Sequence, residues 1–188
     1  TNNLKQTRNR EVDLGYEINT DNLRFKVKTF YSSLKDYIYI EQGVTVNAFH
    51  NIDANIYGAE LSASYFLNDD TSIDMGASYK RGKKDQALVG QTDTDLADVA
   101  PLRGNIALNY EYTSHSIATL GVQASDTWDT IDSDNGEQKL ASWAIVNMKV
   151  KHAVNKQIDF TIGANNLFNK TYVTSNSYAD LTLITTGA

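Results

Sequence analysis

The stretch EVDLGYEINTDNLRFKVKTFY, residues 11–31, decides the fold. Apolar and polar residues alternate on both sides of Thr20-Asp21. Because strand side chains point alternately to opposite faces, each half predicts a strand with one apolar and one charged face. A two-residue turn at Thr20-Asp21 would join the halves as an antiparallel hairpin. The expected register pairs Ile18 with Leu23, Tyr16 with Phe25, Leu14 with Val27, Glu17 with Arg24 and Asp13 with Lys28. Such pairs contribute roughly 0.2–1 kcal/mol each, which favours this register.

Six further segments alternate in the same way, at residues 57–65, 73–80, 102–112, 118–124, 144–151 and 158–164. Short connections near residues 20–21, 68–70, 114–116 and 154–156 alternate with long polar ones near 42–51, 82–100 and 127–141. This sorting of turns and loops is typical of an antiparallel transmembrane β-barrel, which we therefore expect. A soluble antiparallel sheet with one wet face would explain the alternation equally well. It would explain neither the sorting of the loops nor the length of the strands.

The two faces of the expected sheet differ sharply in charge. If the sheet wraps water, its charged face lines the lumen with Asp13, Glu17, Arg24, Lys26, Lys28, Glu60, Asp74, Arg103, Glu111, Lys149 and Asp159. The nearly uncharged apolar face would then contact lipid, where an Arg or Lys near the midplane costs about 2–4 kcal/mol. Tyrosines lie towards the strand ends of this face, as expected for rings at the headgroup level.

The composition of the chain excludes several classes of function. With 188 residues and a net charge of −6, the chain lacks the clustered cations that nucleic acid requires. The absence of Cys excludes disulfides and thiolate metal sites. Neither a glycine-rich phosphate loop nor a nucleophile elbow is present, and Ser114-His115-Ser116 has no orienting acid beside it. We therefore expect no enzymatic activity.

Residues that could contact a ligand lie in or beside the long connections. The basic segment 80–85, with Arg81, Lys83 and Lys84, could attract an anionic metal chelate or meet anionic lipopolysaccharide. His50 and Trp128 are further candidates in the long loops. The acidic segment 126–137 is a candidate Ca²⁺ loop, although its spacing departs from the helix–loop–helix pattern. The ligands of any other metal are unknown from the sequence, because the three His residues cannot converge in this topology.

Several strings resemble the TonB-dependent receptor family. They are TRNREVDLG (7–15), FY (30–31) with DYI (36–38), NIDANIYGAE (51–60), APLR (100–103) with LNY (108–110), and GANNLFNKTY (163–172). They follow the family's order over nearly the whole chain. The resemblance implies a barrel of about 22 strands around an N-terminal plug, in the Gram-negative outer membrane. Residues 1–188 would then be the C-terminal portion of that barrel, about eight strands, with the plug and the final strand outside this chain.

The resemblance also implies a function and its partners. It implies energy-dependent uptake of a metal complex, with a ferric siderophore as the first expectation. Copper, haem or cobalamin uptake and a passive porin remain alternatives, as do a barrel enzyme and a soluble binding sandwich. The expected partners are outer-membrane lipid, lipopolysaccharide, the metal complex, and TonB through the plug. No intrinsic cofactor is expected beyond the transported chelate and the candidate Ca²⁺.

Overall fold

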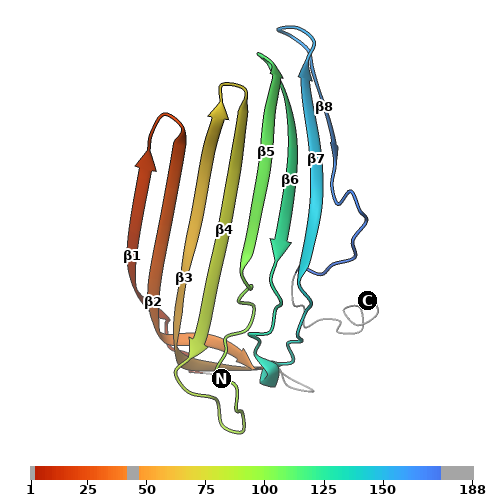
Figure 1. Cartoon of the computed structure of the whole chain (residues 1–188). Helices are drawn as coiled ribbons and strands as arrows, with labels where there is room; N and C mark the ends of the chain where they lie inside the picture. The colour runs from red at the N-terminus through yellow and green to blue at the C-terminus, as the bar shows by residue number, and fades with distance from the viewer. Residues whose placement is uncertain (1–2, 42–46, 175–188) are drawn as a thin grey trace.

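The computed structural model describes residues 3–41 and 47–174, and it contains one antiparallel sheet in which each strand pairs with the next. The eight strands are β1 (Arg8–Asn19), β2 (Leu23–Glu41), β3 (Ala48–Asn68), β4 (Thr71–Lys84), β5 (Arg103–Thr113), β6 (Ser116–Ser125), β7 (Trp143–Ala153) and β8 (Asp159–Ala164). A single 3-10 turn, η1 (Ser133–Asn135), interrupts the connection between β6 and β7. The described sheet is curved and unclosed (Figure 1), and its all-β antiparallel architecture confirms the expected fold class.

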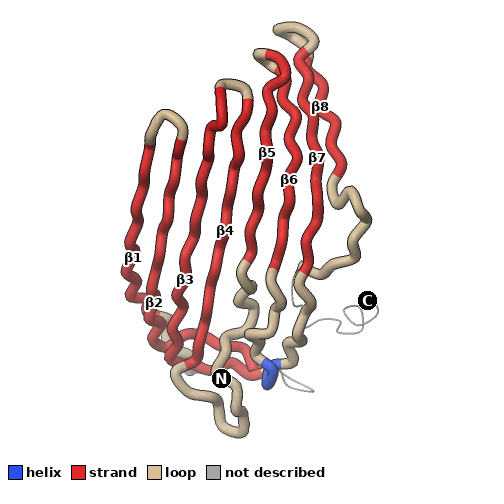
Figure 2. Tube along the Cα trace, viewed as in Figure 1, coloured by secondary structure: helices blue, strands red, loops and turns tan. Residues whose placement is uncertain are grey.

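The connections are sorted by length between the two ends of the sheet, as the sequence predicted. Short turns join β1 to β2, β3 to β4, β5 to β6 and β7 to β8 at one end (Figure 2). The connections that follow β4 and β6 lie at the other end, where β2 ends and β3 begins, and we call it the long-loop end. Strands β2 and β3 span 19 and 21 residues. A tilted strand of about 9–11 residues already crosses a bilayer, so both strands extend beyond one.

The register of the first hairpin differs from the prediction by two residues. Ile18 pairs with Phe25 rather than Leu23, and Glu17 pairs with Lys26 rather than Arg24. The turn is wider than predicted because Thr20 holds it: its amide donates to the Leu23 carbonyl at 2.8 Å, and its Oγ1 accepts from the Leu23 amide at 3.0 Å. A shift of two residues leaves every side chain on its predicted face.

The basic segment 80–85 is not a loop, which corrects the sequence-based interpretation. Strand β4 continues to Lys84, because the chain returns alongside its free edge. The Lys84 amide donates to the Thr94 carbonyl at 2.7 Å, and the Leu96 amide donates to the Gly82 carbonyl at 3.0 Å. Side chains at positions 81 and 83 therefore point to one face of the sheet, and the side chain of Lys84 points to the other.

The apolar face of the sheet is exposed along its length. Leu14 is 71% exposed, Tyr16 60% and Leu108 45%, so these side chains do not pack into a dry interior. The main buried cluster, which includes Leu34, Ala54 and Leu96, lies at the long-loop end. Within the described residues no second sheet covers the apolar face, as a soluble sandwich would require. No helix in residues 3–41 and 47–174 has the length and hydrophobicity to cross a membrane.

Candidate functional site

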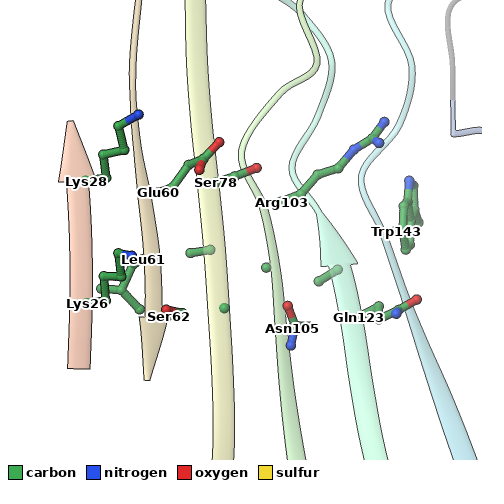
Figure 3. A pocket seen from close by; sticks show the side chains of 14 residues that line it. Lys26, Lys28, Glu60, Leu61, Ser62, Ser78, Arg103, Asn105, Gln123 and Trp143 are labelled. Atoms are coloured by element: carbon green, nitrogen blue, oxygen red, sulfur yellow. The ribbon is translucent and has the colours of Figure 1, made fainter. Parts of the chain in front are cut away.

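The charged face of the sheet forms an open concavity of about 700 Å³. Lys26 and Lys28 reach it from β2, Glu60 from β3, Arg103 from the start of β5 and Trp143 from the start of β7 (Figure 3). These side chains come from strands far apart in the sequence, and only the curvature of the sheet brings them to one surface. Three cations and one carboxylate line this surface, and Asp13 pairs with Lys28 beside it, so the remaining positive charge favours an anionic ligand.

The register places the eleven predicted lumen-lining residues on this same face. For example, Lys28 lies opposite Glu60, and Asp74 lies beside Ser64. Lys28 Nζ lies 2.9 Å from Asp13 Oδ1, and Asp74 accepts hydrogen bonds from Ser64 Oγ at 2.6 Å and Asn109 Nδ2 at 2.7 Å. The face is thus a connected polar surface, and that it lines a closed lumen stays a prediction.

A buried ion pair anchors the long loops to the sheet. Lys84 Nζ lies 3.0 Å from Asp132 Oδ1, and both side chains are fully buried. Tyr39 OH donates to the other Asp132 oxygen, and its ring lies 4.7 Å from Lys84 Nζ. Burial raises the pKa of the Asp132 carboxyl, although the hydrogen bonds from Tyr39 and Lys84 act in the opposite direction. The charge of this carboxylate therefore depends on its two partners.

The acidic residues of segment 126–137 bind backbone amides within that segment and in the neighbouring loop. Glu137 accepts from the amides of Asp132 at 2.7 Å and Asp98 at 2.8 Å. Asp134 Oδ2 accepts from the amides of Thr92 at 2.7 Å and Asp93 at 2.6 Å. In the described part of the chain, no group of three or more His, Asp or Glu is placed to hold a metal ion. The carboxylates that suggested a Ca²⁺ loop instead join the two loops, which we call the loop rim (residues 85–102 and 126–142).

The five predicted ligand-contacting residues do not converge on one point. His50 Nε2 lies 2.8 Å from Glu41 Oε2 at the start of β3. Arg81 pairs with Asp95 at 2.8 Å on the apolar face, and Lys83 lies 3.9 Å from the same carboxylate. Lys84 and Trp128 are buried within the rim. Ligand contact stays a prediction for these residues, and in this structure Lys84 and Trp128 serve to hold the rim together.

Two buried donors near the concavity were not expected from the sequence. Within residues 3–41 and 47–174, Arg103 Nε and Trp128 Nε1 are buried atoms without a hydrogen-bond acceptor. The Arg103 guanidinium carbon lies 6.0 Å from the centroid of the Trp128 ring, and its Nη2 donates to the Thr174 carbonyl. Strand alternation predicted the face of Arg103, but no local signal brings Trp128 to it, because that contact depends on how the loop packs.

Comparison with known proteins identifies the class to which this sheet belongs. A family model described as "TonB dependent receptor-like, beta-barrel" matches residues 1–167. The chain therefore belongs to the TonB-dependent receptor family, whose members are β-barrel proteins of the Gram-negative outer membrane. No curated protein sequence matches the chain significantly.

Solved structures of three metal transporters and receptors are similar to the chain. The copper transporter OprC superposes with a TM-score of 0.84 at 23% identity, over 92% of this chain and 27% of that one. The FrpB iron transporter from Neisseria meningitidis (F3-3 variant) superposes with a TM-score of 0.73 at 15% identity, over 96% of this chain and 30% of that one. The ferric yersiniabactin uptake receptor FyuA from Yersinia pestis superposes with a TM-score of 0.69 at 19% identity, over 88% of this chain and 26% of that one. The chain thus spans less than a third of these structures.

Proposed function

We propose that this chain forms part of the barrel wall of a receptor that takes up a metal complex, with a ferric siderophore as cargo. The observation that carries the proposal is the open concavity below the loop rim, which Lys26, Lys28 and Arg103 line together with one carboxylate, Glu60. Oxygen-rich anions are strong acceptors of charge-assisted hydrogen bonds from such cations. Ferric chelates with carboxylate or catecholate oxygens supply such acceptors.

The geometry supports a simple division of roles. Lys26, Lys28 and Arg103 supply positive charge on the inner wall, where the field attracts an anion arriving from the long-loop end. The loop rim stays folded through its own hydrogen bonds, so it presents a formed surface to that anion. Energy transfer from TonB would act through a plug domain in the complete receptor, as the family resemblance implies.

Copper uptake is the second candidate, favoured by the likeness to OprC. Copper ions prefer thiolate, thioether or imidazole ligands. The chain contains no Cys, and its only two Met residues, Met75 and Met148, lie on the apolar face. His50 is engaged by Glu41. A copper receptor of this kind would therefore need soft ligands from other parts of the protein, so we place the siderophore first.

Growth of a strain whose only TonB-dependent receptor is the complete protein tests this function. Arg103→Gln should raise the siderophore concentration needed for half-maximal growth by about tenfold or more, since a lost charged hydrogen bond contributes about 1.5–3 kcal/mol. Lys149→Gln, which removes an exposed cation from the same face, is the matched control. Rescue by copper and not by ferric chelate would overturn the siderophore assignment. Growth that persists without TonB would indicate a passive pore.

A further inference from the structure

A row of tyrosines crosses the apolar face of strands β2, β3 and β4 near the long-loop end. Tyr31 lies directly opposite Tyr57, with ring centroids 6.4 Å apart, and Tyr79 is one diagonal step further across the sheet. All three rings are exposed. Amphipathic rings in such a row mark the headgroup level of a membrane, so this row marks the boundary of one leaflet.

Cations gather on the same face immediately beyond the tyrosine row. Arg10 and Lys83 lie on the next row of this face, two positions further along their strands towards the long-loop end. Arg8 and Lys35 lie on the row after that, with Lys5 beside them. We call these five residues the basic band. Successive residues on one face of a strand are about 7 Å apart, so the band spans the layer just outside the hydrocarbon.

The basic band carries more positive charge than its acidic neighbours neutralise. Five cations face four carboxylates: Asp36 pairs with Arg8 at 2.8 Å, Asp53 pairs with Lys35 at 2.5 Å, Asp95 lies 3.9 Å from Lys83 and is shared with Arg81, and Asp85 is bound by Asn55. In the described part of the chain, Arg10 forms no ion pair. The paired cations Arg8 and Lys35 remain well exposed, with 73% and 60% of their side-chain surface accessible. Exposed pairs of this kind are weak and exchange readily for a stronger anion.

The opposite end of the same face carries no matching charge. The row nearest the short turns contains Leu23, Tyr65 and Ile73, and no Lys or Arg of β1–β4 lies on that face there. An electrostatic contact with headgroups is therefore restricted to one leaflet. At the long-loop end, that leaflet is the outer one, whose abundant lipid in Gram-negative bacteria carries phosphates on its sugar headgroup.

We propose that the basic band is a binding surface for the phosphates of the lipid A headgroup of lipopolysaccharide. The tyrosine row lies beside the acyl chains, and Arg10 binds the phosphates directly above it, with Lys83, Arg8 and Lys35 turning from their carboxylates to share them. Arginine suits this role because its planar guanidinium can bind two phosphate oxygens at once. The proposal rests on the outer-membrane location and not on the identity of the cargo.

Binding of lipid A to the complete receptor in nanodiscs tests this surface. The variant Arg8→Gln/Arg10→Gln/Lys35→Gln/Lys83→Gln should bind bisphosphorylated lipid A at least about tenfold more weakly than wild type. The control Lys26→Gln/Lys28→Gln/Lys149→Gln/Lys151→Gln removes as many cations from the other face, and its lipid affinity should stay within about twofold. Both variants are compared only after their barrels are shown to be folded by heat modifiability on gels.

A second measurement on the wild type keeps the test independent of folding. Removal of both phosphates from lipid A should weaken its binding to the wild-type receptor by a similar factor, and added salt should reduce the difference. Equal affinity for phosphorylated and dephosphorylated lipid A would overturn the proposal. Equal losses in the two quadruple variants would do the same. Siderophore growth in the band variant is scored separately, so failure of lipid binding and failure of the uptake proposal are distinguishable.

Discussion

Replacement of Lys84 by Met should open the loop rim. The Lys84–Asp132 pair is fully buried, and breaking such a pair leaves an uncompensated charge at a cost of about 3–5 kcal/mol. Because Asp132 is held by Tyr39 and Lys84 together, we expect the loss to appear first as local opening of residues 85–102 and 126–142. Amide hydrogen exchange of the complete receptor in detergent measures this as faster exchange in both loops.

Two further variants separate the ion pair from simple loss of packing. Replacing both partners with apolar residues, as Lys84→Met/Asp132→Leu, should restore much of the protection, because a buried pair and its hydrophobic substitute are often close in stability. Lys151→Met breaks the exposed pair with Asp159, which should contribute about 0–1 kcal/mol. If the amides of the loop rim exchange equally slowly in Lys84→Met and in Lys151→Met, the buried pair does not hold the rim.

A charge placed on the apolar face should destabilise the barrel, whereas the same charge on the next residue should not. Val122 of β6 lies between Ile106 and Val146 on the apolar face, and Gln123 points into the concavity. If the apolar face contacts lipid, Val122→Arg costs about 2–4 kcal/mol at the midplane and less near an interface. Gln123→Arg, with the same change in charge, stays in water and should be nearly neutral.

Urea unfolding of the complete receptor in lipid vesicles measures both changes. The midpoint of Val122→Arg should fall well below that of Gln123→Arg, with the slope of the transition unchanged. Equal midpoints would mean that both faces meet water, and a lower midpoint for Gln123→Arg would reverse the assignment of the faces.

The strands and faces were predictable because alternation depends only on neighbouring residues. Leu14 and Leu108 were assigned to the exposed apolar side, and Asp13 and Lys28 to the charged side, as the structure shows. The register of the first hairpin was not predictable in the same way. A pattern of period two is unchanged by a shift of two residues, so only the hydrogen bonds of Thr20 in the turn distinguish the two registers.

The candidate site was less predictable because loops bring it together. Tyr39 and Asp132 meet across 93 positions of the chain, and the connection that carries Asp132 has no periodic pattern. Lys84 was interpreted as a loop cation, since nothing local indicates that segment 94–96 pairs with the edge of β4. Trp128 was singled out for its residue type, but its approach to Arg103 depends on the same loop packing.

The central claim is that one face of this sheet meets lipid and the other meets water. Nitroxide labels at successive positions of β5, residues 104–110, test it in the complete receptor in lipid vesicles. Collisions with oxygen, which concentrates in the bilayer, should peak at Ile106, Leu108 and Tyr110, and collisions with a water-soluble nickel chelate should peak at Asn105, Ala107 and Asn109. Profiles without this alternation, or with the two reagents exchanged, would contradict the account.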